Sequence, residues 1–212
     1  MMARRSALGA LGGVFSLGVS ACNPFLAKAS YRYRMTVEGK FGGAAVYEVL
    51  AQRTRAILLP DERPGGSALK GEALVLETPT GPVFVLLKSQ GGSAGLIGSV
   101  THALTPDIPM GGQPNFWKAV NRLGDCFASA RGELPPEDWP LMVRFRDLGD
   151  PKSVEQVNPR AIGVKRIVVE TTSDDVTRGI QARLIWLDAL EKSQSDNIFE
   201  TSSSTLVGQL RN

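Results

Sequence analysis

Cysteine and histidine are scarce in this chain of 212 residues, which contains two cysteines and one histidine. A structural zinc site needs about four Cys or His ligands at short, defined spacings. Cys22, His102 and Cys126 supply too few ligands for such a site, so we expect no metal. The same scarcity limits nucleophilic catalysis, because a Ser-His or Cys-His mechanism would have to use His102.

Residues 91–95 (GGSAG) form the only stretch that resembles a glycine-rich phosphate cradle, and they lack the Lys-Ser/Thr of a P-loop. We interpret them as a flexible loop and expect no cofactor. Acidic residues gather at 133–138, 147–155 and 174–175, where paired carboxylates could support glycoside hydrolysis. Asp150 is better explained as a helix cap and Asp174 with Asp175 as a turn, so no catalytic residue is assigned.

A long hydrophobic run is also missing, although the N-terminus has the layout of a secretory signal. Arg4 and Arg5 precede an uncharged segment, residues 6–21, that contains four glycines and ends in small residues. A membrane-spanning helix needs about 20 predominantly apolar residues. We therefore interpret residues 1–21 as a removable signal peptide rather than a membrane span.

The end of this segment, residues 19–22 (VSAC), resembles the lipobox of bacterial lipoproteins, in which an aliphatic and two small residues precede cysteine. That resemblance implies a diacylglycerol thioether on Cys22 and a mature chain that begins there. Residues 27–29 (AKA) offer a competing signal-peptidase pattern, which would release a soluble periplasmic chain from Ser30. We favour lipidation of Cys22, which would leave Cys126 as a buried, apolar cysteine or a reactive one.

The export route and the target membrane depend on weaker signals. Residues 4–8 resemble a twin-arginine motif, but Ala7 stands where the motif has phenylalanine and Gly9 stands where it has lysine. The general secretory route therefore stays open. Asn23 resembles the outer-membrane address of enterobacterial lipoproteins, which favours the outer over the inner membrane. In either case the domain would face the periplasm.

Composition indicates a globular domain beyond the signal, with 42% hydrophobic and 21% charged residues. Without Arg4 and Arg5, 22 basic residues stand against 21 acidic ones, which argues against a nucleic-acid surface. We divide the mature chain into an anchor linker (residues 22–30), one domain (31–192) and a flexible tail (193–212).

Periodicity within that domain predicts an α+β fold with a mostly antiparallel β core and two or three short helices. Alternation at 31–38 places aromatic and aliphatic residues on one face, whereas Arg32 and Arg34 lie on a face that is either solvated or turned to anionic headgroups. Further strands are predicted at 44–51, 68–77, 83–88 (central in a sheet), 141–146 and 164–172. Helices are predicted at 115–124, 151–157 and 180–187, with a long loop at 89–114 and an acidic, proline-rich connection at 133–140.

Four stretches together resemble an uncharacterised family of exported proteobacterial proteins. They are residues 31–38 (YRYRMTVE), 81–87 (GPVFVLL), 147–154 (DLGDPKSV) and 176–187 with its leucines and Trp186. The resemblance covers most of the mature chain and implies a shared fold, with no known activity.

Two functions remain open from the sequence. The first is a membrane-anchored envelope lipoprotein that acts as a non-enzymatic binding or assembly module, with another envelope protein or an apolar ligand as its partner. The alternative is an exported hydrolase that uses His102 or a carboxylate pair.

Overall fold

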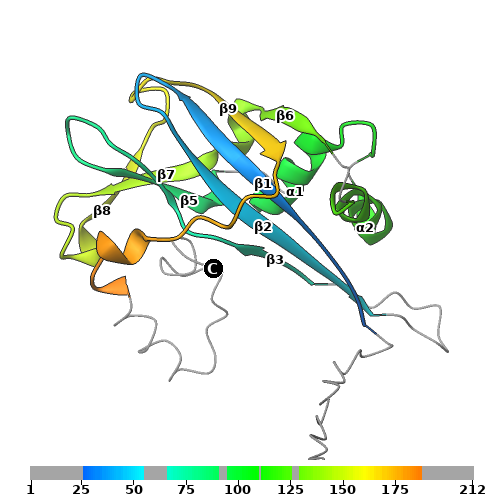
Figure 1. Cartoon of the computed structure of the whole chain (residues 1–212). Helices are drawn as coiled ribbons and strands as arrows, with labels where there is room; N and C mark the ends of the chain where they lie inside the picture. The colour runs from blue at the N-terminus through cyan, green and yellow to red at the C-terminus, as the bar shows by residue number, and fades with distance from the viewer. Residues whose placement is uncertain (1–25, 55–65, 91–94, 110, 126–128, 188–212) are drawn as a thin grey trace, which may run out of the picture.

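The computed structural model describes residues 26–54, 66–90, 95–109, 111–125 and 129–187. Two antiparallel sheets dominate these residues (Figure 1). The larger has the order β3-β2-β1-β9-β6, and its strands are β1 (Leu26–Gly39), β2 (Gly43–Thr54), β3 (Ser67–Lys70), β9 (Val164–Thr171) and β6 (Arg131–Leu134). The smaller has the order β4-β5-β7-β8, with β4 (Leu74–Leu76), β5 (Val83–Ser89), β7 (Pro140–Phe145) and β8 (Val154–Val157). The predicted α+β class with a mainly antiparallel β core is confirmed.

The β1–β2 hairpin follows the predicted alternation. The side chains of Tyr31, Tyr33, Met35 and Val37 are buried, whereas the residues between them are half-buried on the outer face of the sheet. Tyr33 is paired in register with Tyr47 of β2, and their rings stack with centroids 5.3 Å apart. Aromatic residues therefore face the core in the middle of this hairpin, with smaller or aliphatic residues such as Met35 and Ala51 on either side.

The main core lies between the inner face of the five-stranded sheet and a second layer made of the four-stranded sheet and two helices. These helices are α1 (Gly95–Leu104) and α2 (Gly112–Leu123). Glycines allow both to approach the sheet closely, because a Cβ at Gly132 would lie 2.1 Å from the Ala103 carbonyl oxygen and one at Gly124 would lie 2.6 Å from the Ser30 carbonyl oxygen. The C-terminal end of α2 thus packs on β1 at Ser30.

A second, smaller core covers the other face of the four-stranded sheet. Phe84, Leu86 and Phe145 of the sheet pack there against the C-terminal segment that contains Leu184 and Leu187. This explains why residues 83–87 are apolar at consecutive positions: β5 lies inside its sheet, between β4 and β7, and has a core on each face.

The predicted loop at 89–114 was wrong, because it contains α1. Glycine, serine and threonine, which have low helix propensity, obscured this helix in the sequence. Gly98, Ser99 and Thr101 are nevertheless buried in it, and close packing of such small side chains against the sheets compensates for weak propensity. The predicted helix at 115–124 corresponds to α2 and ends at Gly124 as expected.

Four other predicted segments differ from the structure. The strand at 68–77 is broken at Gly71 (φ 145°), where the chain passes from the larger sheet to the smaller one. The helix at 151–157 is a single 3-10 turn, Pro151–Ser153, which Asp150 caps by accepting a hydrogen bond from the Lys152 amide before β8 begins. The helix at 180–187 is likewise a 3-10 turn, Ile180–Ala182, and the connection at 133–140 includes the end of β6.

Replacing Tyr31 and Tyr33 separately by phenylalanine should have opposite effects on stability. The Tyr31 hydroxyl lies 2.8 Å from the Thr101 hydroxyl, so we expect Tyr31→Phe to lower the free energy of unfolding by about 1 kcal/mol. The buried Tyr33 hydroxyl has no hydrogen-bond partner among the described residues, so Tyr33→Phe should leave stability unchanged or raise it by up to about 1 kcal/mol. Urea unfolding of both variants measures the difference, and an equal loss in both would contradict this packing.

Candidate functional site

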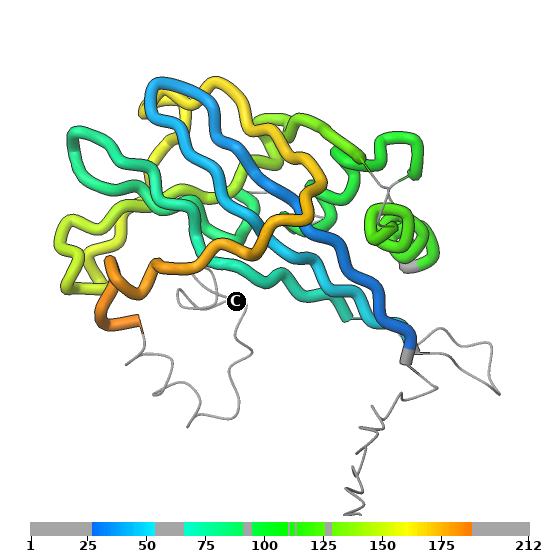
Figure 2. The backbone as a smooth tube through the Cα atoms, in the orientation of Figure 1, coloured from blue at the N-terminus to red at the C-terminus, as the bar shows by residue number. Residues whose placement is uncertain are grey.

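The predicted lipidation site, Cys22, lies outside the described residues, as do Cys126, the signal peptide and the tail. The described chain begins at Leu26, where β1 is already paired with the end of β2. Residues 26–30, which the sequence suggested were linker, therefore belong to the larger sheet. Figure 2 shows this start of β1 at one extremity of the molecule, beside the end of β2.

His102 lies on α1 rather than in the predicted loop, and its side chain is exposed. It borders a pocket of about 230 Å³ between α1, α2 and the first residue of β3. The pocket wall includes apolar residues from both helices and from the turn between them, namely Ile97, Ile108, Phe116 and Ala119. No Asp, Glu, Lys or Arg lies among the described residues that line this pocket.

The polar groups inside the pocket are largely engaged by the protein itself. The Thr101 hydroxyl lies 2.6 Å from the Ile97 carbonyl oxygen as well as close to Tyr31, and the Thr105 hydroxyl donates to the Thr101 carbonyl at 2.7 Å. Ser67, His102 and Asn115 supply the other polar side chains. The pocket is thus chemically suited to an apolar ligand with polar contacts at its border.

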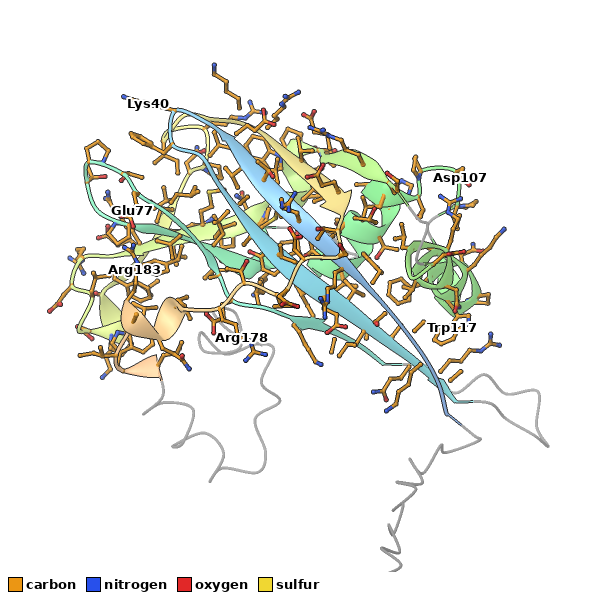
Figure 3. All side chains as sticks on the ribbon, viewed as in Figure 1. Lys40, Glu77, Asp107, Trp117, Arg178 and Arg183 are labelled. Atoms are coloured by element: carbon orange, nitrogen blue, oxygen red, sulfur yellow. The ribbon has the colours of Figure 1, made fainter. Side chains whose placement is uncertain are left out.

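An ion pair holds α2 against the turn that follows α1. Arg122 donates two hydrogen bonds to the carboxylate of Asp107, at 2.6 and 2.7 Å. These bonds lower the pKa of the Asp107 carboxyl below its ordinary value. Figure 3 shows Asp107 beside α2, at the same end of the molecule as Trp117 and opposite Lys40.

The acidic groups considered at 147–155 and 174–175 include several that make structural contacts. Glu155 pairs with Arg144 and Arg146 beside β8, at 3.3 and 3.0 Å. Asp147 accepts a hydrogen bond from the Gly149 amide within a turn. No group of three or more His, Cys, Asp or Glu side chains is arranged to hold a metal ion within the part of the chain that the structure describes.

Arg32 and Arg34 bind the segment that follows β9 instead of facing solvent alone. Arg32 donates to the Ser173 and Asp174 carbonyls and to the Asp175 carboxylate, and Arg34 pairs with Glu170 and Asp174. The segment then crosses the outer face of the larger sheet (Figure 2), and the Thr177 amide donates to the Val46 carbonyl of β2. These two arginines are therefore committed to holding the C-terminal segment in place.

The buried carboxylate of Glu72 anchors the far end of the same segment. It accepts hydrogen bonds from the Gly179 and Ile180 amides, the second at 2.7 Å. This places Leu184 and Leu187 over the smaller sheet. Burial alone would make Glu72 a catalytic candidate. Its hydrogen bonds to two backbone amides instead explain its burial structurally.

Residues 91–95 also fit the G-x-S-x-G pattern of serine hydrolases, and they connect β5 to α1. Residues 91–94 lie outside the described chain. His102 follows seven residues after Gly95, on the same helix α1.

No protein-family model, curated protein or solved structure matches this chain. None of the helices in the described segments is both long and apolar enough to cross a membrane. The pocket between α1 and α2 is accordingly assigned from its own geometry. The sequence predicted one of the two helices, α2, and indicated His102 as a candidate residue, although in a loop. The helix α1 was not predicted, because its apolar positions alternate with glycine, serine and threonine.

We expect removal of the ion pair beside the pocket to be visible in the titration of Asp107. In Arg122→Gln the pKa of the Asp107 carboxyl should rise toward its ordinary value, because the hydrogen bonds that favour the charged form are lost. Since this pKa is lowered in the folded chain, the pair stabilises the fold at neutral pH, and that contribution is lost as the pH falls through the folded pKa. Carboxyl-carbon NMR titration measures the shift.

The matched control for that titration is Arg166→Gln, which removes an arginine that pairs with Glu38 on β1. This control should leave the pKa of Asp107 unchanged. An Asp107 pKa that is the same in wild type and Arg122→Gln would show that the pair does not hold α2 in solution.

Proposed function

We propose that this chain is a bacterial envelope lipoprotein, anchored through Cys22, that acts as a non-enzymatic binding or assembly module. The observation that carries the proposal is the start of β1 at Leu26, four residues after Cys22. A mature chain that begins at the lipobox cysteine keeps the whole of β1. The folded domain would then follow the anchor with almost no intervening linker.

The competing cleavage site is less compatible with this fold. Residues 27–29 form part of β1 and are paired with Arg53, Gln52 and Ala51 of β2. The Ala29 side chain packs against the main core. A chain that began at Ser30 would lose this paired segment and leave the end of β2 without its neighbour, which supports Cys22 as the first mature residue.

The short connection also orients the domain. Four extended residues span at most about 14 Å, so the extremity that contains the start of β1 would lie near the bilayer. Exposed Lys28 and Arg53 flank this extremity. Basic side chains near a membrane surface contribute about 1 kcal/mol each when the lipids are anionic, which would add to the attachment that the lipid provides.

A binding role is favoured over hydrolysis by the chemistry of the pocket between α1 and α2. Its border carries His102 without a described carboxylate that could orient or activate the imidazole. Its walls are apolar, which suits the capture of an apolar ligand. We place the domain on the periplasmic side of the envelope, at the outer membrane in view of Asn23, with other envelope proteins as further partners.

The anchor is tested by the intact mass of the protein from membrane and soluble fractions. We expect the wild type in the membrane fraction, with a chain that begins at Cys22 and carries added lipid mass. Cys22→Ser should lose this mass and leave the membrane fraction, whereas the control Cys126→Ser should retain both. A lipid-free chain that begins at Ser30 in the soluble fraction would contradict the proposal.

A further inference from the structure

The pocket between α1 and α2 lies at the extremity of the domain that the anchor would hold near the bilayer. Ser67, on the pocket wall, is paired with Ala51, which is paired with Ala29. Neighbouring strands are about 4.8 Å apart, so Ser67 lies about 10 Å across the sheet from Ala29. Ala29 is only seven residues from Cys22, and α2 itself ends against β1 at Ser30.

The shape and chemistry of this pocket limit what it can hold. With about 230 Å³, it is smaller than the roughly 300–1,000 Å³ of sites for compact drug-sized ligands. Ile97 and Phe116 contribute apolar surface from opposite helices, and no charged side chain is among the described lining residues. A short, uncharged and apolar segment fits these limits, whereas a peptide backbone would bring amide groups that the engaged threonine hydroxyls leave without partners.

We infer that this pocket binds the methyl end of one acyl chain of a lipid from the bilayer that holds the anchor. The inference rests on the proposed function, because lipidation of Cys22 is what brings the pocket to the membrane surface. The last carbons of the chain lie between α1 and α2, beside Ile97 and Phe116, and His102 and Asn115 form part of the polar border of the pocket. Bilayer lipid is favoured over the acyl groups of Cys22, because withdrawing one of those from the membrane would weaken the attachment.

The test uses the full chain, extracted from membranes with its native N-terminus. It is reconstituted in phosphatidylethanolamine and phosphatidylglycerol vesicles that contain a phospholipid with a diazirine at the end of one acyl chain. After illumination, peptide mass spectrometry locates the label. We expect it on peptides that include Ile97 and Phe116.

Two pocket variants and one control make the test specific. Phe116→Asp places a carboxylate in the pocket, and Ile97→Trp fills the pocket without a charge; both wild-type side chains are half-buried, which favours folding of the variants. Labelling should fall about tenfold in each, because a charge or a lost volume removes the apolar site. Asn121→Asp adds the same charge to the exposed surface of α2, away from the pocket lining, and should label like wild type.

Vesicle flotation separates failure of this inference from failure of the anchor. If all forms float and the label falls outside the pocket, or is unchanged in both pocket variants, the acyl-chain inference is wrong while the anchor stands. If the pocket is instead labelled only when diazirine palmitate is fed to cells and attached to Cys22, the occupant is the anchor itself, which also overturns the inference. If the chain fails to float and Cys22 carries no lipid, the proposed function is wrong.

Discussion

Strand β1 is hydrogen-bonded along both edges, to β2 from Leu26 to Val37 and to β9 from Tyr33 to Gly39. Its inner face contributes Tyr31, Tyr33, Met35 and Val37 to the main core, which both helices and the smaller sheet share. Its outer face holds the C-terminal segment through Arg32 and Arg34, which pair with Asp175 and Asp174. The position of almost every other described element therefore depends on this strand, and with it the direction in which the pocket between α1 and α2 faces.

The same strand links the fold to the proposed anchor. β1 begins four residues after Cys22, so attachment at that cysteine would fix the orientation of a rigid sheet, in contrast to a domain on a long linker. Figure 1 shows α2 on the same side of the molecule as the start of β1, and α2 ends on β1 at Ser30. Lys28 and Arg53 belong to the paired ends of β1 and β2, and α2 contributes residues to the pocket wall. The ion pair between Asp107 and Arg122 connects the turn after α1 to α2.

The strands were predictable because their signals are local. The alternation at 31–38 follows from period-two patterning of aromatic and aliphatic residues. The helices were harder: α2 has an amphipathic pattern, whereas α1 is formed from residues of low propensity whose burial depends on β5, β6 and β9, distant in sequence. The pocket could not be predicted from the sequence for the same reason, since one of the two helices that form its walls is α1. The role of Glu72 was equally hidden, because its partners are backbone amides more than 100 residues away.

Spin labels in vesicle-bound protein test the orientation that this account assigns to the domain most directly. With Cys126 replaced by serine, labels at Lys28 and Lys40 mark the two ends of β1, which are about 40 Å apart in an extended strand. The account predicts strong relaxation of the Lys28 label by a nickel-chelating lipid and little relaxation of the Lys40 label. Equal relaxation at both positions, or stronger relaxation at Lys40, would contradict a domain held by Cys22 with its pocket toward the membrane.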